Sequence, residues 1–300
     1  MKTICFLGDS ITHHGGWVAE VFENIKDEYI VYNCGIGGDK AVKALYRLHT
    51  NCLSHNPDKV VIMFGMNDIE RDLYSEFCQD ENIDEKKQSA LDIYKASMTE
   101  LVETITSYGM EVILCTPTPL DDIHYPEQEK NYCNIALAKC GETVKELAKK
   151  YGCECVDFFD IIYKYIQNGK VKCPDTVHPD PESEHVMAQV FMKELGITDS
   201  IDIETPFVMS DINRQRFTAE QELKRLEMVE WVFLNPFKAE KNYTIQDKLD
   251  MTAALLDGAK KDNAENYIDW YSDYLTKSGK RRDELERQLV DYTLKMARGN

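Results

Sequence analysis

Short apolar runs alternate with longer segments of helical periodicity through the first two-thirds of this 300-residue chain, and this alternation constrains the fold most strongly. The apolar runs lie at residues 2–8, 29–35, 58–65, 110–119 and 153–161. Their nearly continuous apolar character is typical of strands that are buried on both sides of a parallel sheet. Because helical segments separate the runs, the pattern predicts an α/β fold: a five-stranded parallel sheet covered by helices on both faces.

The helical segments also define the domain organisation. In the first two-thirds they cover residues 17–27, 89–109, 131–152 and 180–196, the last with Asp180 as N-cap and Pro181 at the first helical position. Beyond Gly196 no strand is evident, and amphipathic segments cover 216–234, 244–261, 263–279 and 281–298. We therefore predict a domain at 1–197, a linker at 198–210 and an all-helical appendage at 211–300. The appendage could cap a site, mediate dimerisation or pack on the sheet.

Charge and cysteine content restrict the partners and the compartment. A formal net charge of -18 argues against nucleic acid and anionic membranes as partners. The apolar stretch at residues 4–7 is too short for a secretory leader and Asp9 follows it, while no run of 18 apolar residues predicts a membrane span. Ten cysteines then favour free thiols in a reducing cytoplasm. The Cys-Glu-Cys spacing at 153–155 lacks the second pair that a structural zinc site needs.

Polar, glycine-bearing turns follow the first three predicted strands. They read GDS at 8–10, NCGIGGD at 33–39 and FGMND at 64–68. Ligands of parallel sheets bind at the carboxyl ends of the strands, so these turns predict the site. The Ser10 hydroxyl needs a base to become a nucleophile, and Asp175 and His178 in PDTVHPD offer a carboxylate and an imidazole three residues apart. Glycine-turn N–H groups and the Asn67 amide are suited to hold developing negative charge.

Together, the blocks GDSIT, NCGIGGD, GMND and DTVHP resemble the SGNH/GDSL hydrolases, a family of serine esterases and lipases. The resemblance covers about residues 3–196 and implies a flavodoxin-like three-layer α/β/α fold. It implies that Ser10 is the nucleophile and that Asp175 and His178 complete a catalytic triad. It also implies an oxyanion hole made of the backbone N–H groups of Ser10 and Gly38 and the side-chain amide of Asn67.

The expected function is hydrolysis of ester bonds in small substrates, with acetyl esters of sugars or other small alcohols as the leading case, through an acyl-enzyme. A thioesterase or a lysophospholipase on the same site is an alternative. A non-catalytic binding or scaffold protein on an inherited hydrolase fold is an alternative of another class. The lack of an export signal and the helical third argue against a secreted lipase. We expect a small-molecule ester substrate, no metal or cofactor, and leave open a homo-oligomer.

Four further residues are predicted to line or flank the pocket. Asp9 and His13 adjoin Ser10, and His124 and Tyr125 follow the fourth predicted strand. His13 and the adjacent His14 point in different directions and lack an acidic or cysteine partner at ligand spacing, so a metal site is not expected there.

Two competing interpretations are weaker. The GIGG segment is similar to a dinucleotide fingerprint, but Lys40 occupies the position of its third glycine. Asp157 and Asp160 could serve as the triad carboxylate, but both are distant from His178 in sequence.

Overall fold

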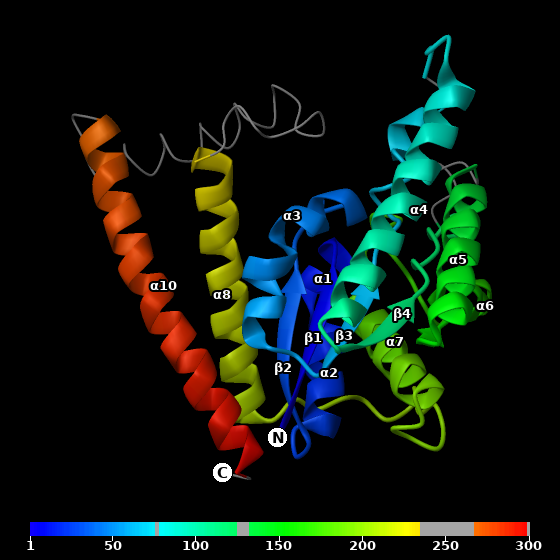
Figure 1. Cartoon of the computed structure of the whole chain (residues 1–300). Coiled ribbons are helices and arrows are strands. Elements are labelled where there is room, and N and C mark those ends of the chain that lie inside the picture. Colours follow the sequence, from blue (N-terminus) through cyan, green and yellow to red (C-terminus); the bar gives the residue numbers. More distant parts are fainter. Residues whose placement is uncertain (76–77, 125–131, 235–266, 299–300) are drawn as a thin grey trace. The chain divides into compact units, whose positions relative to one another are not determined.

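The structure is a computed structural model that describes residues 1–75, 78–124, 132–234 and 267–298. The structure divides into two compact units, residues 1–210 and residues 211–298. A five-stranded parallel sheet lies at the centre of the first unit (Figure 1). Each helix in the described part of the chain is too short or too polar to cross a lipid bilayer.

The sheet has the strand order β2-β1-β3-β4-β5, which is the flavodoxin-like order. The predicted fold class is thereby confirmed. Its strands are β1 (Lys2–Gly8), β2 (Tyr29–Gly35), β3 (Lys59–Met63), β4 (Glu111–Cys115) and β5 (Glu154–Val156). Gly8, the last residue of β1, pairs with Gly35 of β2 and with Met63 of β3. The turns that follow these three strands therefore leave the sheet at the same edge.

Helices connect the strands and follow the last of them. In the first unit they are α1 (Ser10–His14), α2 (Gly16–Ile25), α3 (Ala41–Asn51), α4 (Ile83–Ser107), α5 (Tyr132–Tyr151), α6 (Phe158–Gln167) and α7 (Pro181–Glu194). Two short 3-10 helices span Leu53–His55 and Arg71–Tyr74. Helix α7 begins as expected, because the Asp180 side chain accepts the Ser183 N–H and Pro181 takes the first position.

An aromatic cluster holds one helical layer on the sheet. Phe6 of β1 lies 5.3 Å from the Trp17 ring of α2 and 5.6 Å from the Phe191 ring of α7, centroid to centroid. Trp17 also meets Phe158 of α6 edge to face at 5.7 Å. All four rings are buried, so this layer joins α2, α6 and α7 to β1. Helices α3, α4 and α5 pack beside one another in the other layer (Figure 1).

Three local features differ from the sequence prediction. The predicted fifth strand at 153–161 ends at Val156, because the Asp157 carboxylate caps α6 by accepting the Asp160 N–H at 3.2 Å. The glycine-bearing turn at 8–10 continues directly into α1, a five-residue helix too short to show periodicity. Helix α3 was not predicted, although its buried residues Ala41, Ala44 and Leu48 do follow a helical spacing.

The second unit contains α8 (Asp211–Leu234) and α10 (Tyr267–Ala297), which pack against each other. Arg281 of α10 donates two hydrogen bonds, both 2.8 Å long, to the Glu222 carboxylate of α8. The two helices predicted at 263–279 and 281–298 form one continuous helix from residue 267, because a single glycine at 279 is tolerated within a helix. The predicted helix at 244–261 lies outside the described residues.

Candidate active site

Ser10 is presented by a sharp change from strand to helix. Strand β1 ends at Gly8, and the buried Asp9 side chain accepts the Ile11 N–H at 3.0 Å, so Ser10 becomes the first residue of α1. A Cβ atom at Gly8 would lie 2.2 Å from the Thr12 hydroxyl and 2.9 Å from the Met63 carbonyl oxygen. Only glycine fits where the chain turns this tightly beside β3. The turn therefore fixes Ser10 at the carboxyl edge of the sheet.

His178 and Asp175 complete a hydrogen-bonded relay with Ser10. The His178 Nε2 atom lies 2.7 Å from the Ser10 hydroxyl oxygen, and its Nδ1 atom lies 2.5 Å from Asp175 Oδ2. The two ring nitrogens thus face a hydroxyl on one side and a carboxylate on the other. The His178 side chain is 27% exposed and that of Asp175 is 58% exposed. This arrangement can take a proton from Ser10 onto an imidazole that the carboxylate orients.

The Asp175 carboxylate also shapes the loop that carries His178. Its Oδ1 atom accepts the backbone N–H groups of Val177 at 3.0 Å and His178 at 2.7 Å. Burial alone would raise the pKa of Asp175, but hydrogen bonds from the His178 ring and these N–H groups hold the pKa below its usual range. Asp175 therefore carries its negative charge at neutral pH.

Thr176 gives this loop an unusual backbone conformation. Its φ is 70°, in the left-handed region that β-branched residues rarely occupy, and its side chain is buried. The conformation is held from outside the loop, because Thr176 O accepts the Asp121 N–H at 2.9 Å. The fully buried Asp121 carboxylate also accepts the Cys173 N–H at 3.1 Å. Asp121 thus anchors the segment that carries Asp175 and His178.

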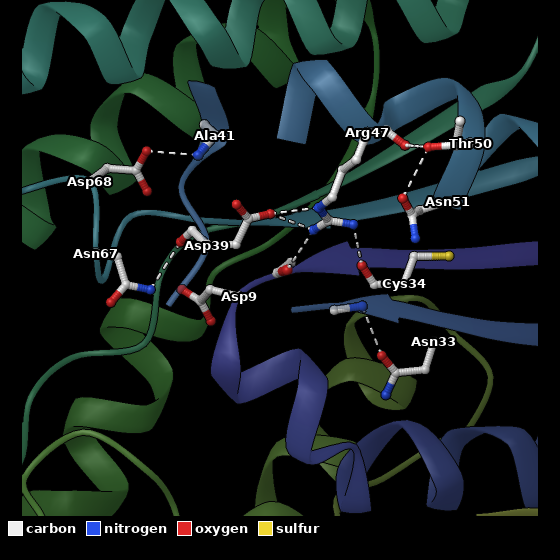
Figure 2. Close-up of polar contacts among 12 residues, drawn as sticks. Asp9, Asn33, Cys34, Asp39, Ala41, Arg47, Thr50, Asn51, Asn67 and Asp68 are labelled. Atoms are coloured by element: carbon white, nitrogen blue, oxygen red, sulfur yellow. Dashed lines mark hydrogen bonds and ion pairs between the residues drawn. The ribbon is translucent and has the colours of Figure 1, made fainter. Parts of the chain in front are cut away.

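Gly38 and Asn67 lie in the turns that follow the strands on either side of β1. Gly38 is exposed and has a φ of 72°, which favours glycine. Asn67 follows β3 by four residues and donates one amide N–H to the Asp39 carbonyl oxygen at 3.0 Å (Figure 2). That bond fixes the side-chain amide against the turn that contains Gly38. Gly38 and Asn67 therefore lie at the same edge of the sheet as Ser10.

Three buried carboxylates lie behind these turns. Burial raises the pKa of Asp9 to about 7 and that of Asp68 to about 7, although backbone N–H groups stabilise their charged forms. Asp68 accepts the N–H groups of Ala41 at 2.8 Å and Gly65 at 3.0 Å. Burial also raises the pKa of Asp39, which is paired with a guanidinium (Figure 2). Asp9 therefore acts as a helix cap within the interior, and its place beside the pocket stays a prediction.

The other histidines near the site take different positions. His14, four residues after Ser10 on α1, stacks on the His178 ring with centroids 4.6 Å apart. A helix that starts at Ser10 places position 14 on the same face as position 10. His124 Nδ1 lies 3.0 Å from both carboxylate oxygens of Asp121.

Several candidates fall outside the arrangement. Tyr125 lies outside the described residues. Asp157 and Asp160 pair with Lys145 at 2.5 and 2.9 Å. Neither competes for His178, which faces Asp175. In the described part of the chain, no third histidine, cysteine or carboxylate joins His13 and His14 in a metal-ligand group.

Known proteins resemble this chain in sequence. The model of the GDSL-like lipase/acylhydrolase family matches residues 6–185. An acetylxylan esterase from Geobacillus stearothermophilus is 26% identical over 218 residues, which cover 65% of this chain and 94% of that protein. A human protein named isoamyl acetate-hydrolyzing esterase 1 homolog is 27% identical over 176 residues, 53% of this chain and 67% of that protein.

Solved structures show the same fold. Axe2, an acetylxylan esterase from Geobacillus stearothermophilus, has a TM-score of 0.54 at 23% identity and covers 66% of this chain and 96% of its own. BT4096, described as a gut microbial diltiazem-metabolizing enzyme, has a TM-score of 0.67 at 16% identity and covers 99% of this chain and 94% of its own. The second likeness of fold includes the C-terminal helices.

The sheet order, the Gly-Asp-Ser turn after β1 and these relatives define a hydrolase of ester bonds with a flavodoxin-like fold. The chain belongs to the GDSL-like lipase/acylhydrolase family. The resemblance inferred from the four sequence blocks is confirmed.

Proposed function

We propose that the protein is a serine esterase that removes small acyl groups, acetyl above all, from small alcohols. The relay from Ser10 through His178 to Asp175, with distances of 2.7 and 2.5 Å, is the observation that carries this proposal. A serine hydroxyl is a weak nucleophile until a base takes its proton, and this arrangement supplies the base in a fixed orientation.

The reaction follows from the relay in two halves. Ser10 Oγ attacks the ester carbonyl carbon while His178 Nε2 takes the hydroxyl proton, and the Asp175 carboxylate stabilises the resulting imidazolium. The backbone N–H groups of Ser10 and Gly38 and the Asn67 amide hold the oxyanion. His178 then protonates the leaving alcohol, which leaves an acyl group on Ser10. Water, deprotonated by His178, attacks that acyl group and restores the free hydroxyl.

The acyl group is suggested by the relatives. The Geobacillus stearothermophilus relative is named an acetylxylan esterase and the human relative is named for hydrolysis of isoamyl acetate. The two names share acetate and differ in the alcohol. We therefore place the specificity of this chain in the acyl group, with a sugar or another small alcohol as the leaving group.

Labelling with a fluorophosphonate probe, followed by peptide mapping, tests the nucleophile. An adduct on Ser10 that is absent from Ser10→Ala supports the proposal, and a folded wild type that takes no label contradicts it. A series of 4-nitrophenyl esters from acetyl to octanoyl then tests the acyl group. We expect kcat/KM to fall steeply beyond butyryl, whereas a rise toward octanoyl would favour a lysophospholipase. Faster cleavage of an acyl thioester than of the matching ester would favour a thioesterase.

We also propose that the protein works in the cytoplasm. All ten cysteines are free thiols. A reducing compartment keeps thiols in this state. Immunolocalisation or fractionation of the native cells would test this location.

A further inference from the structure

Arg47 extends from α3 to the carboxyl ends of the first two strands. Its side chain is 12% exposed. The guanidinium donates from Nη1 to Cys34 O at 2.7 Å and from Nη2 to Gly8 O at 3.1 Å (Figure 2). It also donates from Nε to Asp39 Oδ2 at 2.7 Å. One rigid planar group thus ties together the end of β1, the end of β2 and the turn that follows β2.

The same contacts continue to the residues assigned to the oxyanion hole. Asp39 directly follows Gly38, and its carbonyl oxygen accepts the Asn67 amide at 3.0 Å. Gly8 O, which Arg47 contacts, also accepts the Ile36 N–H from the start of this turn at 3.1 Å. The turn is therefore held at its beginning by β1 and at its end by the guanidinium and Asn67.

We propose that Arg47 is a positioning residue for the oxyanion hole, acting through Asp39 on the Gly38 N–H and the Asn67 amide. The inference rests on the proposed esterase function. Oxyanion donors contribute most when they are fixed before charge develops, and a displacement of about 1 Å can lower a rate about a hundredfold. Lysine keeps the charge but cannot bond three acceptors in one plane, so Arg47→Lys removes the positioning and leaves the charge.

A double-mutant cycle on the full chain tests this role. We expect Arg47→Lys to lower kcat for 4-nitrophenyl acetate about a hundredfold with KM changed less than about threefold. In an Asn67→Ala background the same change should lower kcat less than about tenfold, because the donor that it positions is already gone. Tyr46→Ala, an exposed neighbour on α3, is the matched control and should keep the wild-type kcat.

The outcomes separate this inference from the function on which it rests. A wild type with neither Ser10 labelling nor hydrolysis refutes the proposed function. An active wild type with equal losses in both backgrounds shows that Arg47 acts on the fold alone and overturns the positioning role. If Arg47→Lys does not fold, Asp39→Asn replaces it in the cycle, since it keeps the shape of the side chain and weakens the bond to the guanidinium.

A second, independent observation concerns three cysteines away from the Ser10 relay. The sulfur atoms of Cys5 on β1, Cys34 on β2 and Cys52 after α3 all lie within 4.8 Å of one another, and all three residues are buried. A metal ion about 2.3 Å from each of three sulfurs would place them about 4 Å apart, so the triangle needs only a small contraction. Sequence spacing gives no sign of it, because the three positions are brought together by the sheet.

We propose that Cys5, Cys34 and Cys52 bind one thiophilic metal ion of the Cu(I) class. Three sulfur ligands without a carboxylate select soft ions, and a three-coordinate site suits Cu(I) better than Zn²⁺, which takes four ligands.

Competition with a chromogenic Cu(I) chelator under anaerobic, reducing conditions tests the site. We expect the wild type to remove one equivalent of Cu(I) from the chelator and Cys34→Ser or Cys52→Ser to remove none. Cys78→Ser, which changes a cysteine outside the cluster, should bind like the wild type. Binding by Cys34→Ser and Cys52→Ser equal to that of the wild type, or no binding by the wild type, would overturn the proposal.

Discussion

Glu184 provides a sharp test of the electrostatics of this fold. It lies in the first turn of α7, six residues after His178, and accepts the Gly16 N–H from the start of α2 at 3.3 Å. Burial raises its pKa from 4.5 to about 7; the Gly16 hydrogen bond opposes the shift, and the Asp180 charge adds to it. The folded protein therefore holds a proton on Glu184 at a pH where the unfolded chain has released it.

The difference between the two pKa values sets the size of the effect. At 1.36 kcal/mol per pKa unit, the full penalty is about 3 kcal/mol, and partial exposure of the side chain reduces it to about 2 kcal/mol. Because the pKa is higher in the folded state, the penalty is absent below about pH 4.5, grows as the pH rises, and is complete above about pH 7. Glu184→Gln keeps the shape and removes the charge. It should stabilise the protein by about 2 kcal/mol at pH 8 and by less than 1 kcal/mol at pH 5.

Urea unfolding at both pH values measures this difference. Trp17 is buried in α2 and reports on the first unit, provided that Trp231 and Trp270 are replaced by Phe in every variant. Glu182→Gln changes an exposed glutamate in the same helical turn and is the matched control. A stabilisation by Glu184→Gln that is equal at pH 5 and pH 8, or absent at both, would refute the reasoning.

Three further changes should separate the parts of the site. Asn67→Ala should lower kcat for an acetyl ester about a hundredfold, and a silent substitution in steady-state kinetics would remove Asn67 from the oxyanion hole. Asp175→Asn should leave measurable turnover above that of Ser10→Ala, since the Asp175 carboxylate is 58% exposed and water can partly replace it. Gly35→Ala would bring a Cβ within 2.4 Å of the His13 backbone nitrogen and should lower stability by about 3 kcal/mol in thermal unfolding. Gly37→Ala, where a Cβ meets nothing within 4 Å, should have little effect, and equal losses would contradict the steric argument.

Much of the sheet could be predicted because its strands are apolar on both sides. The predicted bounds of β1 and β2 match the structure, and β3 and β4 lie within their predicted runs. The fifth run was ambiguous, since an apolar stretch of this length fits a strand or a buried helix. The Asp157 cap and the Thr116 hydroxyl, which accepts the Phe159 N–H at 2.8 Å, favour the helix. Both effects depend on contacts that periodicity does not contain.

The candidate site divides in the same way. Ser10, Asp175 and His178 could be named because short local blocks carry them, and the structure places the three side chains within hydrogen-bond distance. The contacts of Arg47 and Asp121 could not, because each joins segments more than ten residues apart through backbone carbonyl or N–H groups. Such bonds depend on the direction in which a backbone carbonyl or N–H group points. The type of amino acid at that position does not reveal this direction.

The left-handed backbone of Thr176 affects both the stability of its loop and the geometry of the site. A β-branched residue in that conformation is disfavoured by about 1–2 kcal/mol, and a glycine there would remove the strain. Glycine would also increase the backbone freedom between Asp175 and His178, which would disturb the distance between these two side chains. Relief of backbone strain and a fixed distance between these two side chains therefore favour different residues at position 176.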